Sequence, residues 1–200
     1  MRETPEAAFA EASAAMVRGD WHGFFACIDR DSLMTIAENG VGRFISGGDR
    51  YAATFAGLCV RNGIPADMPE KLRAAAARIT ESAGAMLTAG IPQDRKKMLE
   101  DSIRHKALVD DYRDTLKKIV KASPKIHAFV ADLEIALRQE TESGSVSTRL
   151  FVDETLEAVS VSGSSAKGIR RLRGGATEDV SFVRRRGGEW FIKPFTKSRT

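Results

Sequence analysis

The chain has 200 residues, of which 42% are hydrophobic and 29% are charged, proportions that exclude a fibrous or wholly disordered protein. Its length suits one domain with a sizeable core, and no apolar run approaches the roughly 18 residues that a membrane span needs. The first residues lack the basic start and apolar core of a signal peptide. We therefore expect a cytoplasmic protein without a membrane partner, although an exported protein whose signal had been removed would show the same features.

The net charge of +4 is distributed unevenly along the chain. The stretch from Thr148 onward contains eleven Lys and Arg against six Asp and Glu, a net of +5, which leaves −1 for residues 1–147. Any attraction to an anionic partner is therefore expected in the last quarter of the chain.

Two amphipathic helices are predicted before residue 30. The first begins with Thr4 as N-cap and Pro5 in the first turn, and Gly19 ends it. Asp20 can cap a second helix, in which large apolar side chains recur at helical spacing. They are Trp21, Phe24, Phe25 and Ile28. Four large residues on one face predict that this helix is buried against another element.

The next part of the chain is predicted to be helical, with breaks at glycine and proline. Gly40 and Gly42 weaken the helical pattern of residues 31–45, which we expect to be broken or partly extended. Another helix is expected over residues 51–61. Three more helices should form an insertion over residues 64–140.

The longest helix of this insertion carries charges of both signs and an apolar stripe. The charges indicate a solvated face stabilised by ion pairs one turn apart. The apolar stripe can pack on the rest of the chain or on a second subunit, so a homodimer is one expected assembly.

From Thr148 the pattern changes to short runs with β character, separated by turns that contain glycine. The runs cover residues 150–161, 166–173, 177–185 and 189–195. A turn about every twelve residues is typical of a meander of hairpins. We therefore expect an α+β fold, in which N-terminal helices pack on a C-terminal antiparallel β-meander within a single domain over residues 1–200.

The two ends of the chain carry a family resemblance. The stretches TPEAAFAEASAAMVRGDWHGFFACID and VSFVRRRGGEWFIKPF resemble the first helices and the last hairpin of the nuclear transport factor 2-like superfamily, which includes ketosteroid isomerase-like proteins. The resemblance implies a curved antiparallel sheet that wraps the first helix into a cone and encloses a pocket. The helices of residues 64–140 stand where this superfamily usually has a short connection. No acidic residue and tyrosine fall where an isomerase would use them, so no catalytic residue is carried over.

A pocket between the first helices and the sheet would bind a small apolar or amphipathic molecule. The aromatic residues that could line such a pocket, or simply fill the core, are Trp21, Phe24, Phe25, Phe182 and Trp190. Core packing is the more ordinary role for these side chains. The expected function is binding without catalysis, either of that ligand or of a protein partner on the sheet.

Arginines of the predicted meander are candidates for binding an anion. These candidates are Arg171, Arg173, Arg184 and Arg186. Clustered guanidinium groups could bind phosphate or nucleic acid. However, a hairpin that turns at Gly174-Gly175 places Glu178 and Asp179 across from the first two of these arginines and from Arg170, so cross-strand pairing should consume much of the charge. Nucleic acid is therefore a less expected partner.

Three remaining features have an ordinary and a functional interpretation. His22 near Asp20 could act as a general base in a small isomerase, dehydratase or hydrolase, but it equally suits an exposed position near a helix start. Gly47-Gly48-Asp49-Arg50 could offer N–H groups to a phosphate, but Asp49 suits an N-cap better. Cys27 and Cys59 fit no zinc spacing and are expected to be buried thiols, so we expect neither metal nor cofactor.

Overall fold

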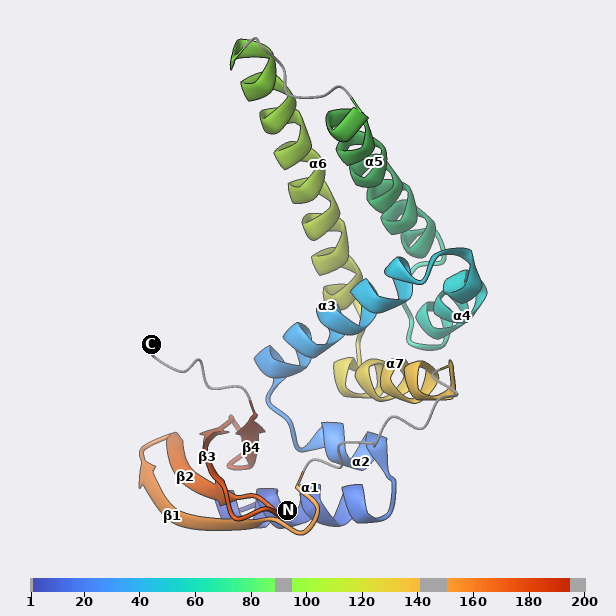
Figure 1. Cartoon of the computed structure of the whole chain (residues 1–200). Helices are drawn as coiled ribbons and strands as arrows, with labels where there is room; N and C mark the ends of the chain where they lie inside the picture. Colours follow the sequence, from blue (N-terminus) through green and yellow to red (C-terminus); the bar gives the residue numbers. More distant parts are fainter. Residues whose placement is uncertain (1, 89–94, 141–150, 195–200) are drawn as a thin grey trace. The chain divides into compact units, whose positions relative to one another are not determined.

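The computed structural model describes residues 2–88, 95–140 and 151–194 (Figure 1). The chain divides into two compact units. The sheet unit comprises Met1–Ala37 and Lys125–Thr200, and the helical unit comprises Glu38–Pro124. The first boundary lies within helix α3 (Arg30–Ser46), so this one helix contributes to both units.

The sheet unit contains four antiparallel strands in the order β1-β2-β3-β4, and this order is a meander (Figure 1). The strands are β1 (Thr155–Ser162), β2 (Ser165–Arg171), β3 (Thr177–Arg184) and β4 (Trp190–Lys193). The helices of this unit are α1 (Pro5–Val17), α2 (Trp21–Ala26), the first part of α3, and α7 (Ile126–Glu140). The predicted α+β class, with helices first and an antiparallel sheet after them, is confirmed.

The predicted caps start the first two helices. The hydroxyl of Thr4 accepts a hydrogen bond from the N–H of Ala7 (3.1 Å), and the carboxylate of Asp20 accepts one from the N–H of Gly23 (2.8 Å). Each cap satisfies one N–H group that the first helical turn leaves without a backbone partner. Gly19 separates the two helices with a φ of 71°, a left-handed conformation that glycine adopts without steric cost.

The core of the sheet unit lies between the helices and one face of the sheet. Ala8 and Ala12 of α1 are fully buried, and their small side chains allow a close approach to the strands. Phe151 lies in this core, with its ring centroid 5.0 Å from that of Phe9 and 5.7 Å from that of Phe24. The strands contribute Val180, Phe182, Trp190 and Ile192, all buried.

Strand β1 begins later than the sequence predicts. The run predicted over residues 150–161 becomes a strand only at Thr155, and Phe151 and Asp153 have φ values of 67° and 57°. These left-handed conformations prevent extended pairing, while they allow the fully buried Phe151 ring to enter the core. Residue 150 and residue 195, the end of the last predicted run, lie outside the described residues.

Strand β4 is hydrogen-bonded along both of its edges. One edge pairs with β3, and the other receives the start of the chain and the link between α2 and α3. The N–H of Trp190 donates to the carbonyl of Arg2 (2.9 Å), the N–H of Ile192 donates to that of Cys27 (2.9 Å), and the N–H of Asp29 donates to that of Ile192 (2.8 Å). These bonds fix the α2–α3 link against the sheet.

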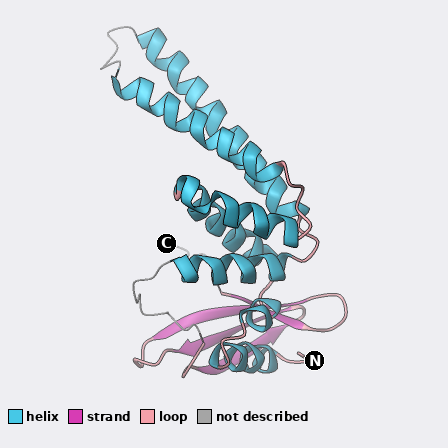
Figure 2. Cartoon of the chain, turned by 90° about the vertical axis from the view of Figure 1, so that its right-hand side faces the viewer, coloured by secondary structure: helices cyan, strands magenta, loops and turns pink. Residues whose placement is uncertain are grey.

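The helical unit contains the rest of α3 and four further helical segments. They are the 3₁₀ turn η1 (Gly48–Tyr51), α4 (Ala52–Arg61), α5 (Met68–Thr88) and α6 (Arg95–Ala122). Its core includes Phe44 and Phe55, whose rings stack with centroids 5.8 Å apart, together with Leu72 and Ile119. Helices α5 and α6 lie side by side and form a hairpin (Figures 1 and 2). Among the described helices, none is both long and apolar enough to cross a membrane.

Two helical expectations differ from the structure. The segment expected to be broken near Gly40 and Gly42 is the continuous helix α3, because its buried stripe of Leu33, Ala37, Val41 and Phe44 outweighs the low helix propensity of two glycines. The insertion was expected over residues 64–140, whereas the helical unit spans Glu38–Pro124 and α7 packs on α2 in the sheet unit.

Candidate ligand-binding pocket

The five aromatic residues proposed from the sequence have different environments in the structure. Phe24, Phe182 and Trp190 are core residues, each at most 3% exposed. Trp21 is partly exposed, stacks on Phe25 (centroids 6.0 Å apart), and lies beneath the guanidinium of Arg138, 4.2 Å from the ring centroid. Phe25 is the member of this set that also lines a cavity.

The cavity lies in the sheet unit and has a volume of about 310 Å³. Its walls come from the end of α2, the start of α3, the start of α7, strand β4 and the turn before it. The apolar lining residues are Phe25, Ala26, Ile28, Leu33, Ile126 and Phe191, and the polar ones are Arg30, His127 and Arg185. An apolar wall with a few convergent polar groups is typical of a small-molecule site, and the volume is at the lower end of the usual range.

A buried carboxylate holds one wall of the cavity in place. The side chain of Asp29 is fully buried, and its Oδ2 accepts a hydrogen bond from the N–H of Asp31 (3.1 Å), which caps α3. The guanidinium of Arg185 donates to Asp29 Oδ1 and lies 3.5 Å from Asp31. A buried charge requires such a partner. The hydrogen bond to Asp29 holds the pKa of Arg185 above its ordinary value. The positive charge of Arg185 is therefore balanced by its carboxylate partners.

A second arginine orients the aromatic wall. Arg2 is buried, and its guanidinium lies 4.5 Å from the centroid of the Phe191 ring, a cation–π geometry. The same guanidinium donates to the carbonyl of Ala26 and lies 3.3 Å from a carboxylate oxygen of Glu189. These contacts lower the pKa of the Glu189 carboxyl and fix Phe191 against the end of α2.

The remaining polar groups of the wall are Arg30 and His127. Burial, followed by electrostatic interactions with His22, Lys125 and Arg2, lowers the pKa of His127 below its ordinary value near 6.5, so its imidazole is mostly neutral near pH 7. Arg30 is exposed at the first position of α3. Within the described part of the chain, the side chains of Arg30 and His127 have no hydrogen-bond or ion-pair partner.

His22 lies outside this cavity. Its Nε2 lies 3.2 Å from Asp132 Oδ1, and the pair joins α2 to α7. The imidazole is half exposed, and the carboxylate belongs to a helix-packing contact that also includes Trp21 under Arg138. The geometry favours a structural role for His22 over that of a general base.

The four candidate arginines of the meander are spread over the sheet, and most of them have a hydrogen-bond or ion-pair partner. Arg171 makes two hydrogen bonds to Glu157 (2.8 and 3.0 Å), and they lower the pKa of that carboxyl. Arg184 donates to the carbonyl of Gly188 (3.1 Å), and Arg173 lies 3.8 Å from Asp153. The remaining candidate, Arg186, is exposed. These four side chains therefore do not converge on one anion site.

One of the expected ion pairs between neighbouring strands of the meander is present, that of Arg170 with Glu178. Arg170 lies opposite Glu178 in the β2–β3 register, and its guanidinium donates to that carboxylate. A second carboxylate, Glu154, lies 3.3 Å from the same arginine, and burial raises its pKa.

Two other sequence interpretations have clear outcomes. Asp49 does not cap α4: it lies inside the 3₁₀ turn η1, which begins at Gly48, and it pairs with Arg73. Cys27 and Cys59 are buried free thiols, as predicted, and burial raises the pKa of Cys59 to about 12.

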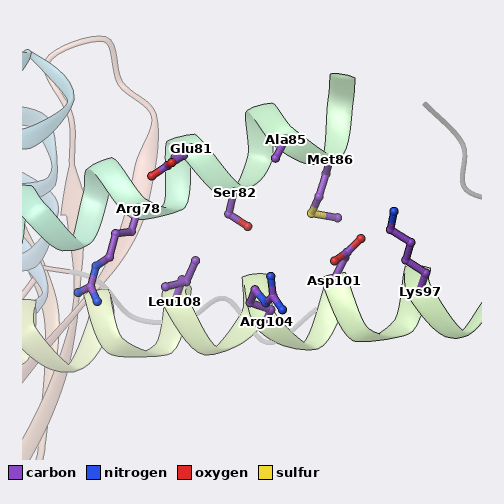
Figure 3. A pocket seen from close by; sticks show the side chains of 9 residues that line it. All are labelled: Arg78, Glu81, Ser82, Ala85, Met86, Lys97, Asp101, Arg104 and Leu108. Carbon is purple, nitrogen blue, oxygen red and sulfur yellow. The ribbon is translucent and has the colours of Figure 1, made fainter. Parts of the chain in front are cut away.

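A larger groove of about 500 Å³ lies between α5 and α6 in the helical unit. Figure 3 shows Ser82 and Met86 of α5 facing Arg104 and Asp101 of α6. Charges of both signs line it, and His105 is already bonded to Ser82 (3.2 Å). Fewer of its lining residues are apolar than in the cavity of the sheet unit, namely Ala85, Met86 and Leu108.

Among the described residues, no group of three or more His, Cys, Asp or Glu side chains could hold a metal ion.

Comparison with known proteins finds no relative of this chain. No protein-family model, no curated protein and no solved structure matches the chain.

Proposed function

We propose that the sheet unit binds a small amphipathic molecule, without catalysis, in the cavity between α2, α3, α7 and β4. The observation that carries the proposal is the composition of the walls, in which Phe25, Leu33 and Phe191 face polar groups across about 310 Å³. At about 30 Å³ for each water-sized group, this volume suits a ligand of roughly ten non-hydrogen atoms. The resemblance of the two chain ends to the nuclear transport factor 2-like superfamily supports the proposal, because it implies a pocket between the first helices and the sheet.

The absence of catalysis is part of the proposal. A histidine acting as general base needs an orienting carboxylate within hydrogen-bond reach. Among the described residues, no carboxylate is bonded to His127, the histidine in the cavity wall. The histidine that does have a carboxylate partner, His22, lies outside the cavity.

Native mass spectrometry of the freshly purified protein tests the proposal first, because it detects a retained small molecule directly. The second step is the pocket-filling variant Ala26→Leu, which should weaken binding of that molecule about tenfold or more by occupying its space. Ala53→Leu on the exposed face of α4 is the matched control. Equal affinity in wild type, variant and control would place the ligand elsewhere.

A second candidate function, self-association through α6, is favoured by one surface stripe. Its members recur every three or four residues and are all exposed: Lys96, Leu99, Ile103, Ala107, Asp110 and Asp114. Leu99 and Ile103 are 62% and 61% exposed, and helical spacing puts them opposite the side of α6 that faces α5. The outer face of the sheet carries Lys167 and Asp179 and also exposes Ile169, which is 37% exposed.

The charged ends of this stripe are complementary. It runs from basic through apolar to acidic, so two antiparallel copies of α6 would place Lys96 near Asp114, Ile103 near Ala107 and Leu99 near Asp110 of the other copy. Sedimentation velocity of Lys96→Glu should show dissociation, and adding Asp114→Lys should restore the dimer. Arg61→Glu on α4 makes the same charge change away from the stripe and should have no effect. A protein that stays monomeric at every concentration excludes this candidate.

A further inference from the structure

The three arginines around the cavity differ in how far their charge is compensated. Arg185 has two carboxylate partners, Asp29 and Asp31. Arg2 lies 3.3 Å from Glu189 and 3.9 Å from Glu11. Arg30 has no ion-pair partner among the residues that the structure describes. The polar side of the cavity therefore carries one uncompensated positive charge.

The helix does not explain the position of this charge. Arg30 is the first residue of α3, where the N–H groups of the first turn give the helix end a partial positive charge. A cation at this position is slightly unfavourable for the helix. An anion nearby would offset this cost, and Asp29 and Asp31, the acidic side chains beside it in sequence, already contact Arg185.

The lining of the cavity also selects the sign of a ligand. It contains two arginines and one histidine but no Asp or Glu. A cationic group would meet repulsion there without a counter-charge, and a neutral polar group would leave Arg30 uncompensated. An anionic group would meet a guanidinium, which binds carboxylate and phosphate through paired hydrogen bonds.

We infer that the ligand of the proposed cavity is an amphiphile with an anionic end group, a carboxylate or a phosphate, which Arg30 binds beside His127. This inference rests on the proposed function and names the class of its ligand. The apolar part lies against Phe25, Leu33 and Phe191, and the end group lies at the mouth formed by the starts of α3 and α7.

His127 makes the binding sensitive to pH. The groups that act on it are His22, Lys125 and Arg2, and each disfavours its protonation. Arg30 and Arg185 line the same wall of the cavity, and Asp29 and Asp31 lie beside Arg185. A bound anion has the opposite effect, so protonation and binding reinforce each other. Affinity should therefore rise as the pH falls below 7, and His127→Gln should remove that rise.

Calorimetric titration of the full chain with four probes tests the inference. The probes are nonanoate, octyl phosphate, octanol and octylamine, which share the same octyl chain. Nonanoate or octyl phosphate should bind at least about tenfold more tightly than octanol, and octylamine more weakly still. Whichever anion binds more tightly identifies the end group. Binding of none of the four contradicts the proposed function itself, whereas equal binding of octanol or octylamine overturns only the inference.

Variants locate the end group. Arg30→Gln should weaken binding of the tighter anion about tenfold while leaving octanol unchanged, and Arg30→Lys should lose less than Arg30→Gln, because lysine keeps the charge but not the paired hydrogen bonds. Arg43→Gln, on the same helix but in the helical unit, is the control. Unchanged anion binding in Arg30→Gln would refute the assigned contact. The comparison of probes on the wild-type protein remains decisive if a variant fails to fold.

Discussion

Asp29 is a fully buried carboxylate that caps α3 and pairs with Arg185. The two roles can be separated, because asparagine can still cap a helix but cannot neutralise a guanidinium. The sequence shows an Asp before a helical stretch, but it does not show that an arginine from the last hairpin closes over it. The pair joins residues 156 positions apart, and only the folded chain brings them together.

Substitution of Asp29 should therefore have a graded effect on stability. Asp29→Ala should lower the free energy of unfolding by about 2 kcal/mol, since it removes both the cap and a partly solvated ion pair. Asp29→Asn should cost less, because the cap persists. Urea denaturation measures both, and Asp31→Asn, at a largely exposed carboxylate, should stay within about 0.5 kcal/mol of wild type. Equal losses for Asn and Ala would show that capping contributes nothing.

His127 should make stability depend on pH. Its folded-state pKa lies below the unfolded value near 6.5, so the unfolded chain binds more protons between the two values. The free energy of unfolding should consequently fall as the pH drops through 6.5 towards the lowered pKa, and should level off below it. Urea denaturation between pH 7.5 and 5 measures this loss, and His127→Gln should flatten the curve. An unchanged slope in that variant would assign the dependence to other groups.

At the scale of elements, α6 changes character along its length. Leu116, Ile119 and Val120 are buried near its end, whereas Met98, Leu99 and Ile103 near its start are 45% exposed or more. The contact between α6 and α5 changes in the same way, because charged residues line it near the start of α6 (Figure 3). Helix formation alone stabilises such a segment little, so its distal turns depend on the few contacts they make.

Hydrogen exchange should reveal this gradient in α6. Amides of residues 98–106 should exchange faster than those of residues 114–121, because local opening there breaks few buried contacts. Mass-spectrometric exchange on the monomer measures this difference. Protection that rises at residues 98–106 with protein concentration would instead indicate that a second copy covers the stripe. Uniform protection at all concentrations would contradict the gradient.

Local signals account for the elements that the sequence predicts well. Helix caps and glycine turns depend on only four or five neighbouring residues, so they can be predicted from the sequence. The caps at Thr4 and Asp20 and the turns of the meander are examples. The sequence does not predict that α3 is continuous, because burial of its apolar stripe outweighs the low helix propensity of Gly40 and Gly42. The same limit applies to Phe151, whose left-handed conformation goes with the burial of its ring in a core that other elements build.

At the scale of the whole chain, each unit has its own buried core. Phe182 and Ile192 belong to that of the sheet unit, and Phe55 and Leu72 to that of the helical unit. The sequence predicts an inserted helical region but not its limits, because nothing local distinguishes a helix that packs on the sheet unit from one that does not. The cavity is equally hidden, since its walls come from segments around residues 25–33, 126–127 and 185–191. Only Phe25 among its lining residues was a sequence candidate.

Two cores predict that the chain does not unfold in a single step. Scanning calorimetry should show two transitions, or one broadened transition with a calorimetric enthalpy above the van't Hoff value. Phe182→Ala should shift one component downward and Phe55→Ala the other, because each leaves a large cavity in one core. A single sharp transition that both variants shift equally would show that the two cores melt together.

The double pairing of β4 also has a consequence for synthesis of the protein. The strand closes against Arg2 and the link at Cys27–Asp29, segments that leave the ribosome long before it does. At about 5 to 20 residues per second, roughly 10 to 35 seconds separate the completion of α1 from that of β4. The helical unit is made entirely within this interval, so it can fold while the apolar faces of α1 and α2 still await the sheet. The apolar faces that α1 and α2 turn to the sheet therefore stay without their native partner until the last strand has emerged.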